Sequence, residues 1–396
     1  MRDTFEAIEA RVHAWECYDP ERLSLPGLKV GIKDIINTAD FPTRRGSPIY
    51  KSYTPGNDAR IVSKLRQAGC VIVGKTTTSE FGVHHLYADT KNPHDFTRTP
   101  GTSSAGSAVA VATGQVPVAI GTQTGGSVIR PASYCGVWAF KPSFGLIPRT
   151  GILKTADTLD TVGIFADTPG RLRQVLDILR VSGKDYASEQ QLERNRSEEI
   201  YAHGATVPDG HPLIEEALEV HRKIYHKSLS YYFRKEVEQF PDLISDMFKE
   251  QVEEGNRITP TEYRQLLERQ QCLGPKIEAE IFGEAKFLIL HKGCGVAPVD
   301  ESKRDPDTCA VWTLLGLPVI NVPYNQVDGL PCGTQIVARK YWDYPLLDYA
   351  VSFGMAHVDG SRPYPDIRAL MWGGERIIGG RSPVERLYGE RNGSNV

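Results

Sequence analysis

The sequence predicts an α/β fold in which a mostly parallel or mixed sheet is covered by helices on both faces. Strand-like and helix-like segments alternate along residues 1–181. Expected strands such as Val71–Val73 and Val116–Ile120 are apolar at nearly every position, which is typical of strands buried on both faces. Because such strands have no polar face to expose, helices must cover the sheet above and below.

Local signals place the individual elements. Residues 4–16 have the spacing of an amphipathic helix, and Asp58 is the expected N-cap of a second helix that runs through Gln67 and stops at Gly69. The other expected helices are residues 106–113, 169–181, 212–228, 231–254, 261–280 and 344–353. The expected strands are residues 28–36, 71–73, 116–120, 137–140, 286–290, 317–322 and 334–338.

The composition changes twice along the chain. From about residue 184 to residue 284 the sequence is charged, rich in tyrosine and mostly helical in pattern. Residues 355–396 are rich in glycine, arginine and proline and match no pattern that predicts a structure. The chain could form one large α/β domain or two smaller ones, with a helical segment at about 184–284 and a C-terminal tail of unknown role at 355–396.

Charge and composition restrict the class of partner. The formal net charge is −3 and no dense block of lysine and arginine occurs, which disfavours a nucleic-acid surface. No run of about 18 apolar residues is present, so no membrane span is expected, and the charged N-terminus does not resemble a signal peptide. The seven cysteines are scattered without a C-x-x-C pair, so we predict neither disulfides nor a zinc site and expect a reducing cytoplasm.

Residues 99–132 concentrate the features that are typical of a catalytic site. Two clusters of glycine, serine and threonine, Gly101–Ser107 and Gly121–Ser127, flank the expected strand Val116–Ile120. Such clusters place backbone N–H groups and hydroxyls where a ligand can approach closely. A rigid strand between two small-residue loops is a common way to position catalytic groups.

This stretch resembles the amidase signature family, and further blocks extend the resemblance over most of residues 28–180 and 290–354. The resemblance implies a single large domain over residues 1–354 with a twisted mixed sheet, whose helical segment at about 184–284 lies on the substrate side. Residues 184–211 are shorter than is usual in that family, so we expect the sheet to lack one edge strand. The matching blocks are residues 31–36, 68–82, 135–151, 158–166, 312–323 and 328–341.

The resemblance implies three catalytic residues. Ser127 matches the nucleophile, Ser103 matches a proton relay that follows a cis peptide bond, and Lys33 matches the terminal base. A lysine can accept a proton at neutral pH only if burial lowers its pKa, and the apolar run around Lys33 favours burial. Since neighbouring side chains on a strand face opposite ways, Asp34 need not pair with Lys33. The alternatives are a loop serine, a helix N-cap and a salt-bridged lysine, respectively.

The resemblance also implies an oxyanion hole formed by backbone N–H groups of Thr124, Gly125 and Gly126. Adjacent glycines allow a close approach that a Cβ would block, although a plain Gly-Gly turn is the alternative. Gln123 stands where the family commonly has aspartate, and Thr102 and Ala105 each replace a common glycine.

Two other motifs predict no site. Residues 69–76 satisfy the G-x-x-x-x-G-K-T pattern of a phosphate-binding loop, but a helix precedes Gly69 and the middle residues form the expected strand. His84 and His85 are adjacent, and adjacent side chains rarely bind the same metal ion. The resemblance likewise implies neither a metal nor a cofactor.

The resemblance implies an amidase that hydrolyses a small linear amide through a seryl acyl-enzyme. An A subunit of a glutamyl-tRNA amidotransferase, an esterase with the same residues and a non-catalytic binding protein are the alternatives, and a homo-oligomer is left open. We expect residues 200–284 to set substrate choice, with Tyr225 and the cluster Tyr231, Tyr232 and Phe233 as candidate pocket walls. The alternative is that these aromatic side chains pack the helices onto the sheet.

Overall fold

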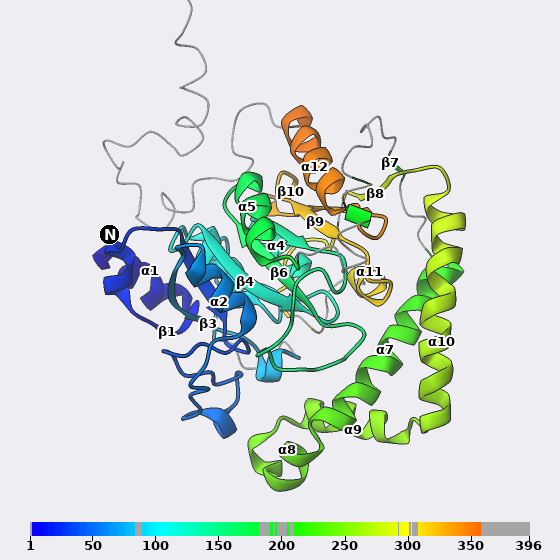
Figure 1. Cartoon of the computed structure of the whole chain (residues 1–396), viewed down its shortest axis with the longest axis horizontal. Coiled ribbons are helices and arrows are strands. Elements are labelled where there is room, and N and C mark those ends of the chain that lie inside the picture. Colours follow the sequence, from blue (N-terminus) through cyan, green and yellow to red (C-terminus); the bar gives the residue numbers. More distant parts are fainter. Residues whose placement is uncertain are drawn as a thin grey trace, which may run out of the picture.

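A mixed ten-stranded sheet forms the centre of the computed structural model (Figure 1). The structure describes residues 2–83, 89–181, 191–192, 195, 204–205, 210–291, 293–300, 302 and 308–357. The expected tail at 355–396 lies outside this range from residue 358 onward. The prediction of an α/β fold with a mixed sheet between two layers of helices is confirmed.

The strand order within the described residues is β1-β3-β2-β4-β6-β5-β9-β12-β8-β7. β2 runs parallel to its neighbours β3 and β4, β7 runs parallel to β8, and the other neighbouring pairs are antiparallel. The strands are β1 Trp15–Tyr18, β2 Lys29–Lys33, β3 Val71–Thr76, β4 Val118–Gln123, β5 Trp138–Lys141, β6 Thr161–Ala166, β7 Gly204–Ala205, β8 Phe287–Leu290, β9 Val319–Val322 and β12 Thr334–Ala338. A separate hairpin joins β10 Gln326–Val327 to β11 Leu330–Pro331.

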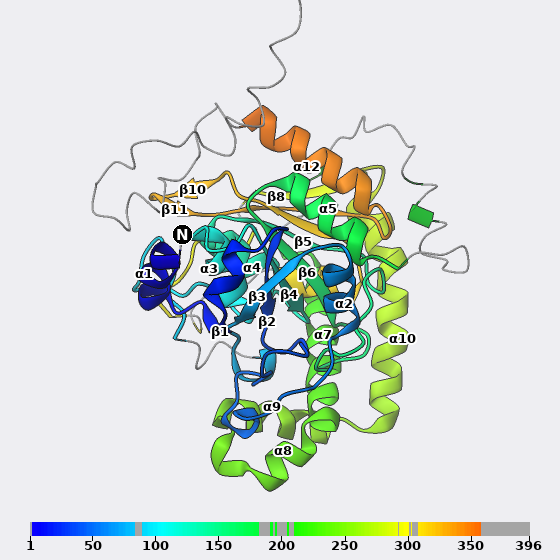
Figure 2. The same ribbon diagram turned by 60° about the vertical axis from the view of Figure 1, so that its left-hand side comes forward.

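Alternate residues of the strands pack into two apolar cores, one on each face of the sheet. Ala119 and Phe165 pack on the face that carries α3, α4, α11 and the long helices, whereas Ile120 and Ile164 pack on the face that carries α2, α5 and α12 (Figure 2). The helices are α1 Arg2–Val12, α2 Arg60–Gln67, α3 Ala105–Ala112, α4 Ile129–Cys135, α5 Pro169–Leu179, α7 Pro212–Tyr232, α8 Arg234–Gln239, α9 Asp246–Arg257, α10 Pro260–Ile277, α11 Cys309–Leu314 and α12 Asp343–His357.

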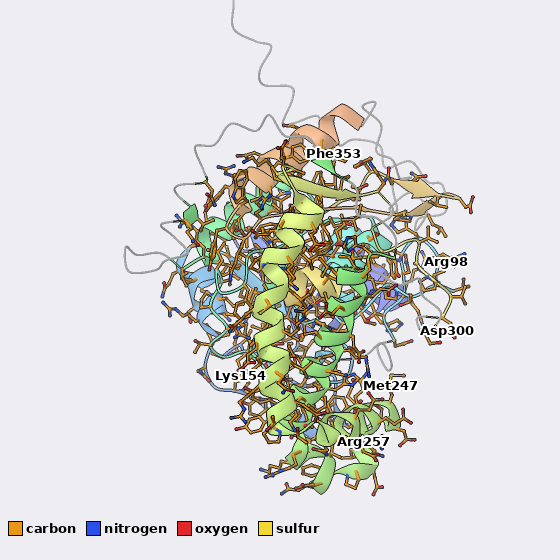
Figure 3. All side chains as sticks on the ribbon, turned by 90° about the vertical axis from the view of Figure 1, so that its right-hand side faces the viewer. Arg98, Lys154, Met247, Arg257, Asp300 and Phe353 are labelled. Carbon is orange, nitrogen blue, oxygen red and sulfur yellow. The ribbon has the colours of Figure 1, made fainter. Side chains whose placement is uncertain are left out.

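The helices α7 to α10 form a helical arm, which we define as residues 212–282. α7 packs against both α9 and α10. Figures 1 and 3 show α7 and α10 side by side, and in Figure 1 they lie at the right-hand margin of the molecule. The buried residues Ile214, Ala217, Val220 and Ile224 recur every three or four positions along α7. This spacing gives α7 one apolar face, which binds it to the rest of the domain.

The prediction of a helix over residues 4–16 is wrong at its C-terminal end, because α1 stops at Val12 and β1 follows. The buried carboxylate of Glu9 accepts hydrogen bonds from the amides of Ala14 and Trp15 at 3.0 Å each. These bonds hold the chain in a turn, and His13 adopts a φ of +52° there. Glu9 therefore redirects the chain from helix into the edge strand.

Two further predictions about helices are wrong. Ala59 rather than Asp58 occupies the N-cap position of α2, while the Asp58 carboxylate accepts from the Ala39 amide at 2.8 Å and from Arg66 Nε at 2.9 Å. The single helix expected over residues 231–254 is broken into α8 and α9. The chain leaves the helical conformation near Phe240, and Ser245 then caps α9 through the Phe248 amide.

Sequence patterns did not single out β1, β6, β7, α4 or the β10–β11 hairpin as separate elements. At one edge of the sheet the two-residue strand β7 pairs with β8. Because residues 182–190 and 196–203 lie outside the described part of the chain, the expected loss of an edge strand stays a prediction. Among the described helices, none combines the length and the apolar character that crossing a bilayer requires.

Candidate active site

The parallel strands β2 and β4 bring the expected catalytic residues to one edge of the sheet. Lys33 is the last residue of β2, and Gln123 is the last residue of β4. Since parallel strands end on the same side, Lys33 and the loop that follows β4 lie at a common edge. Ser127 lies in that loop, just before α4, and Ser103 lies just before α3.

Lys33 is fully buried and contacts two hydroxyl groups. Its Nζ lies 2.6 Å from Ser103 Oγ and 3.0 Å from Thr122 Oγ1. Burial lowers the pKa of the Lys33 ammonium from its usual 10.5 to about 7, and the carboxylate of Asp160 opposes this shift without cancelling it. The predicted burial of Lys33 is therefore confirmed, and a substantial fraction of Lys33 is a neutral amine at neutral pH.

Asp34 faces away from Lys33, as the alternation of side chains predicts. Its carboxylate lies 3.2 Å from Lys75 Nζ and accepts a hydrogen bond from the Arg44 amide at 2.9 Å. Burial raises the pKa of Asp34 to about 6 although Lys75 opposes the shift, and burial also lowers the pKa of Lys75. The ammonium partner of Asp34 is thus Lys75, which leaves Lys33 free for another role.

Ser103 lies behind a cis peptide bond between Thr102 and Ser103, as expected from the resemblance. The N-cap position of α3 belongs to Ser104, whose side chain makes no capping bond. The alternative that Ser103 is a helix N-cap is therefore wrong. The Ser103 hydroxyl instead contacts Lys33, while Thr78 Oγ1 donates to the Ser103 carbonyl at 3.0 Å.

Ser127 is partly exposed in the turn between β4 and α4. Within the part of the chain that the structure describes, its hydroxyl makes no hydrogen bond to protein. The structure thus brings Lys33 and Ser103 into direct contact, whereas Ser103 and Ser127 are not hydrogen-bonded to each other. A partly exposed hydroxyl without a protein partner remains available to a ligand.

The amide N–H groups of residues 124–127 donate to no acceptor in the described structure. We refer to these four residues as the nucleophile loop. A Cβ at position 126 would lie 2.4 Å from Arg130 Nη2 and 3.1 Å from Cys309 Cβ, so the Arg130 guanidinium would have to move to admit it. A Cβ at position 125 would meet only His221 Cε1, at an ordinary 3.7 Å. Packing is therefore tighter around the second glycine of the pair than around the first.

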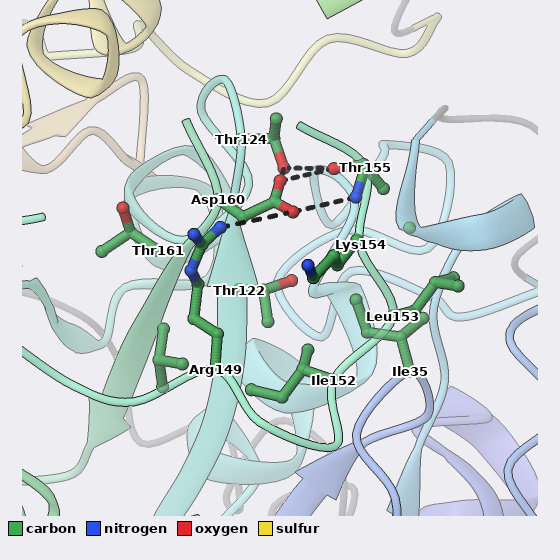
Figure 4. A pocket seen from close by; sticks show the side chains of 12 residues that line it. Ile35, Thr122, Thr124, Arg149, Ile152, Leu153, Lys154, Thr155, Asp160 and Thr161 are labelled. Carbon is green, nitrogen blue, oxygen red and sulfur yellow. Dashed lines mark hydrogen bonds and ion pairs between the residues drawn. The ribbon is translucent and has the colours of Figure 1, made fainter. Parts of the chain in front are cut away.

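A narrow pocket, part of it open to solvent and with room for about one water molecule, adjoins this edge of the sheet (Figure 4). Thr122 and Thr124 connect the pocket to Lys33 and to the nucleophile loop. Asp160 accepts hydrogen bonds from Thr124 Oγ1 at 2.7 Å and from Thr155 Oγ1 at 2.5 Å, as Figure 4 shows. The remaining lining residues are Ile35, Gly82, Arg149, Ile152, Leu153, Lys154, Thr161 and Val162.

None of the aromatic residues expected in a pocket wall, Tyr225 included, is among the described residues that line this pocket. Tyr231 is 78% exposed, and the Tyr232 hydroxyl donates to Asp157 at 2.6 Å. Phe233 is buried against Phe81 and Phe248, with ring centroids 4.8 and 5.1 Å away, so core packing is the correct interpretation for Phe233. The described residues that line the pocket lie between positions 35 and 162, so none of these comes from the helical arm.

Two side chains that no sequence pattern predicts contact the nucleophile loop. His221 Nε2 lies 2.7 Å from the Thr124 carbonyl oxygen, and Thr313 Oγ1 lies 2.7 Å from the Gly125 carbonyl oxygen. No local pattern marks either residue. Of the two excluded motifs, residues 71–76 form β3 rather than a loop, as predicted, and His84 and His85 lie outside the described residues.

Comparison with known proteins places this arrangement in context. A family model described as Amidase matches residues 3–207. The chain is 30% identical over 404 residues to the A subunit of glutamyl-tRNA(Gln) amidotransferase from Halobacterium salinarum, a match that covers 83% of the chain and 95% of that relative. It is 44% identical over 180 residues to the corresponding protein of Anaeromyxobacter sp. (strain K), but this match spans only 36% of the relative's length and 44% of the chain.

Solved structures share the fold at lower sequence identity. Native peptide amidase from Stenotrophomonas maltophilia superposes with a TM-score of 0.75 at 23% identity, covering 92% of this chain and 94% of that one. A 6-aminohexanoate cyclic dimer hydrolase superposes with a TM-score of 0.78 at 21% identity, covering 91% and 93%. At these identities the likeness establishes the fold alone.

Proposed function

Because this chain belongs to the amidase signature family, we propose that it hydrolyses the C–N bond of a small linear carboxamide through a seryl acyl-enzyme. The observation that supports this most is the contact of 2.6 Å between the buried Nζ of Lys33 and the Ser103 hydroxyl. Because burial lowers its pKa to about 7, Lys33 can accept a proton from the nucleophile through Ser103. Ser127 is the proposed nucleophile.

In the proposed first step, Ser127 Oγ attacks the amide carbonyl carbon. Its proton passes to Ser103 Oγ while the Ser103 proton passes to Lys33 Nζ, so the lysine becomes an ammonium and Ser103 is unchanged. The carbonyl oxygen acquires negative charge. The unpartnered N–H groups of the nucleophile loop are the proposed donors to it, a contribution worth about 3–4 kcal/mol per donor in comparable enzymes.

In the second step the proton returns from the Lys33 ammonium through Ser103 to the amide nitrogen. The C–N bond then breaks, an amine or ammonia leaves, and the acyl group remains on Ser127 as an ester. Water then attacks this ester, and its proton passes through Ser103 to Lys33. The proton returns from Lys33 through Ser103 to Ser127 Oγ as the bond to the acyl group breaks. The products are a carboxylic acid and an amine, Ser127 is restored, and the balance needs no cofactor.

The curated relatives favour a second candidate function. Both relatives compared above are named as the A subunit of a glutamyl-tRNA(Gln) amidotransferase. In that case the same residues would release ammonia from a carboxamide for transfer to an acceptor, with this chain working inside a larger assembly. The chemistry at Ser127 is shared by both candidates, and the acceptor of the nitrogen distinguishes them.

The test uses the full-length chain and a panel of amides, ureas and esters, with release of ammonia or amine as the readout. We expect turnover by the isolated chain, a loss on the order of 10⁴-fold or more in Ser127→Ala, and labelling of Ser127 by a fluorophosphonate. Release of nitrogen only with partner proteins present would favour the transferase. Turnover of esters alone would indicate an esterase, and unlabelled Ser127 without turnover would indicate a binding protein.

A further inference from the structure

Three consecutive carbonyl groups of the nucleophile loop, those of residues 124–126, each accept a hydrogen bond from outside the loop. In chain order, the donors are His221 Nε2 at 2.7 Å, Thr313 Oγ1 at 2.7 Å and the Arg130 amide at 2.9 Å. The Arg130 bond belongs to the first turn of α4 and any residue could supply it. The other two bonds require particular side chains from α7 and α11.

Holding a carbonyl group also fixes the direction of the next amide. In a planar trans peptide unit the C=O of one residue and the N–H of the following residue point in opposite directions. Among the described residues the only cis bond joins Thr102 to Ser103, so the loop peptides are trans. The three anchored carbonyls therefore direct the N–H groups of residues 125–127 away from His221, Thr313 and α4.

The Thr313 hydroxyl has one proton, and its surroundings determine where that proton goes. Gln123 Nε2 lies 3.0 Å from Thr313 Oγ1, and Gln123 Oε1 accepts from the amides of residues 128 and 129 at 2.8 and 3.1 Å. The carboxamide orientation is thus set, and its N–H donates to Thr313. That leaves two carbonyl acceptors for the Thr313 proton, those of Gly125 at 2.7 Å and Cys309 at 3.0 Å, and the shorter contact favours Gly125.

The His221 ring contributes in the same way from the helical arm. A carbonyl oxygen can only accept, so Nε2 of His221 carries the proton that lies between it and the Thr124 oxygen. His221 is only 6% exposed and lies midway along α7, whose apolar face holds it in place. The arm is thereby connected directly to the loop that carries Ser127.

We infer that Thr313 and His221 are positioning residues for the oxyanion hole, and that Gln123 orients the Thr313 hydroxyl for this role. The inference rests on the proposed function. Neither side chain has to touch the substrate, because each acts through a peptide group of the nucleophile loop. Losing either bond allows its peptide unit to rotate, and the N–H that points at the developing oxyanion in the wild-type chain is then misdirected.

Matched variants test the inference with 4-nitrophenyl acetate, an ester that needs only the nucleophile and the oxyanion donors. Thr313→Val keeps the shape but removes the proton, whereas Thr313→Ser keeps the proton; His221→Leu and His221→Gln form the corresponding pair. We expect Thr313→Val and His221→Leu to lose roughly 10- to 100-fold in kcat with KM little changed. The Ser and Gln variants should stay within a few-fold of wild type.

A second measurement separates positioning from general structural damage. Sulfur accepts hydrogen bonds more weakly than oxygen, so the rate ratio between the ester and its thiono analogue reports how well the N–H donors fit the oxygen. This ratio should fall in Thr313→Val and His221→Leu while the melting temperature stays close to that of wild type. Gln123→Glu should mimic Thr313→Val, because a carboxylate attracts the Thr313 proton away from Gly125, and combining the two should add no further loss.

Wild-type values of kcat and of the ester-to-thionoester ratio in Thr313→Val and His221→Leu would overturn the inference. So would equal losses in the Ser and Gln variants, or additive losses when Gln123→Glu is combined with Thr313→Val. Failure of the proposed function has a different signature, because Ser127→Ala would then retain the activity of the wild-type chain. If the Thr313→Val protein does not fold, the isosteric Gln123→Glu variant supplies the same comparison.

Discussion

Replacing Lys33 by methionine should abolish catalysis yet stabilise the protein at neutral pH. Lys33 is fully buried and its pKa falls from 10.5 to about 7 on folding. The native state therefore binds fewer protons than the unfolded state between these values, so the free energy of unfolding rises with pH across that window. By linkage, the shifted pKa of Lys33 makes the wild-type chain less stable than a chain with an uncharged residue at position 33. The difference is about 4 kcal/mol at pH 7 but only about 1 kcal/mol at pH 10.

Methionine fills a similar volume without a charge, but it forfeits the hydrogen bonds to Ser103 and Thr122. If those bonds contribute about 1 kcal/mol each, Lys33→Met should be more stable than wild type by about 2 kcal/mol at pH 7 and less stable by about 1 kcal/mol at pH 10. Urea denaturation at the two pH values, followed by circular dichroism, measures both differences. The change of sign is the signature of a buried lysine that folds in its neutral form.

Lys75 provides a matched control on the adjacent strand. Lys75 and Lys33 are both 0% exposed, but Lys75 has a buried carboxylate partner in Asp34 at 3.2 Å. Lys75→Met leaves that carboxylate unpaired, so it should destabilise the chain by about 3–5 kcal/mol at pH 7. A Lys33→Met protein that is less stable than wild type at pH 7, with a difference that does not vary with pH, would refute the reasoning.

Three further outcomes are expected. The value of kcat/KM for a fixed amide should rise with pH through about 7 and then level off, because the neutral amine of Lys33 is the base; a profile that is flat down to pH 5 would contradict this. Ser103→Ala should lower kcat by about 10²- to 10⁴-fold with unchanged circular dichroism, and wild-type turnover would remove Ser103 from the relay. Phe233→Ala should cost about 3–5 kcal/mol of stability and reduce activity equally on all substrates, because Phe233 packs in an apolar core. Tyr231→Ala, at a site 78% exposed, should change stability by less than about 0.5 kcal/mol. Activity losses in Phe233→Ala that differ between substrates would assign Phe233 to the substrate pocket.

The parts of the site that local sequence could predict are those determined by neighbours in the chain. An apolar run predicts that Lys33 is buried, and the two-residue period of a strand predicts that Asp34 points the other way. The structure agrees with both, through the pKa of Lys33 and the contact between Asp34 and Lys75. The cis bond before Ser103 was accessible from family resemblance but not from local chemistry.

The remaining features depend on residues that are distant in sequence. From the sequence, Gln123 was only a departure from the family's common aspartate. Its role depends on a hydrogen bond to Thr313, which lies 190 positions further along the chain. His221 lies 97 positions from the carbonyl that it holds. The end of α1 escaped prediction for a related reason, since helical spacing continues through residues 13–16 while the Glu9 carboxylate captures the amides of Ala14 and Trp15.

The positions of the site residues along the chain also determine when the site can be completed during synthesis. The proposed catalytic residues all precede position 128, but Thr313 is 188 positions beyond Gly125 and arrives just ahead of β9, the strand that pairs with β5. At roughly 5–20 residues per second, a ribosome needs about 10 to 40 s to make the intervening chain. A nascent chain arrested before residue 313 should therefore carry Ser127 on a loop that lacks its Thr313 hydrogen bond, and it should react more slowly with a fluorophosphonate than the released protein.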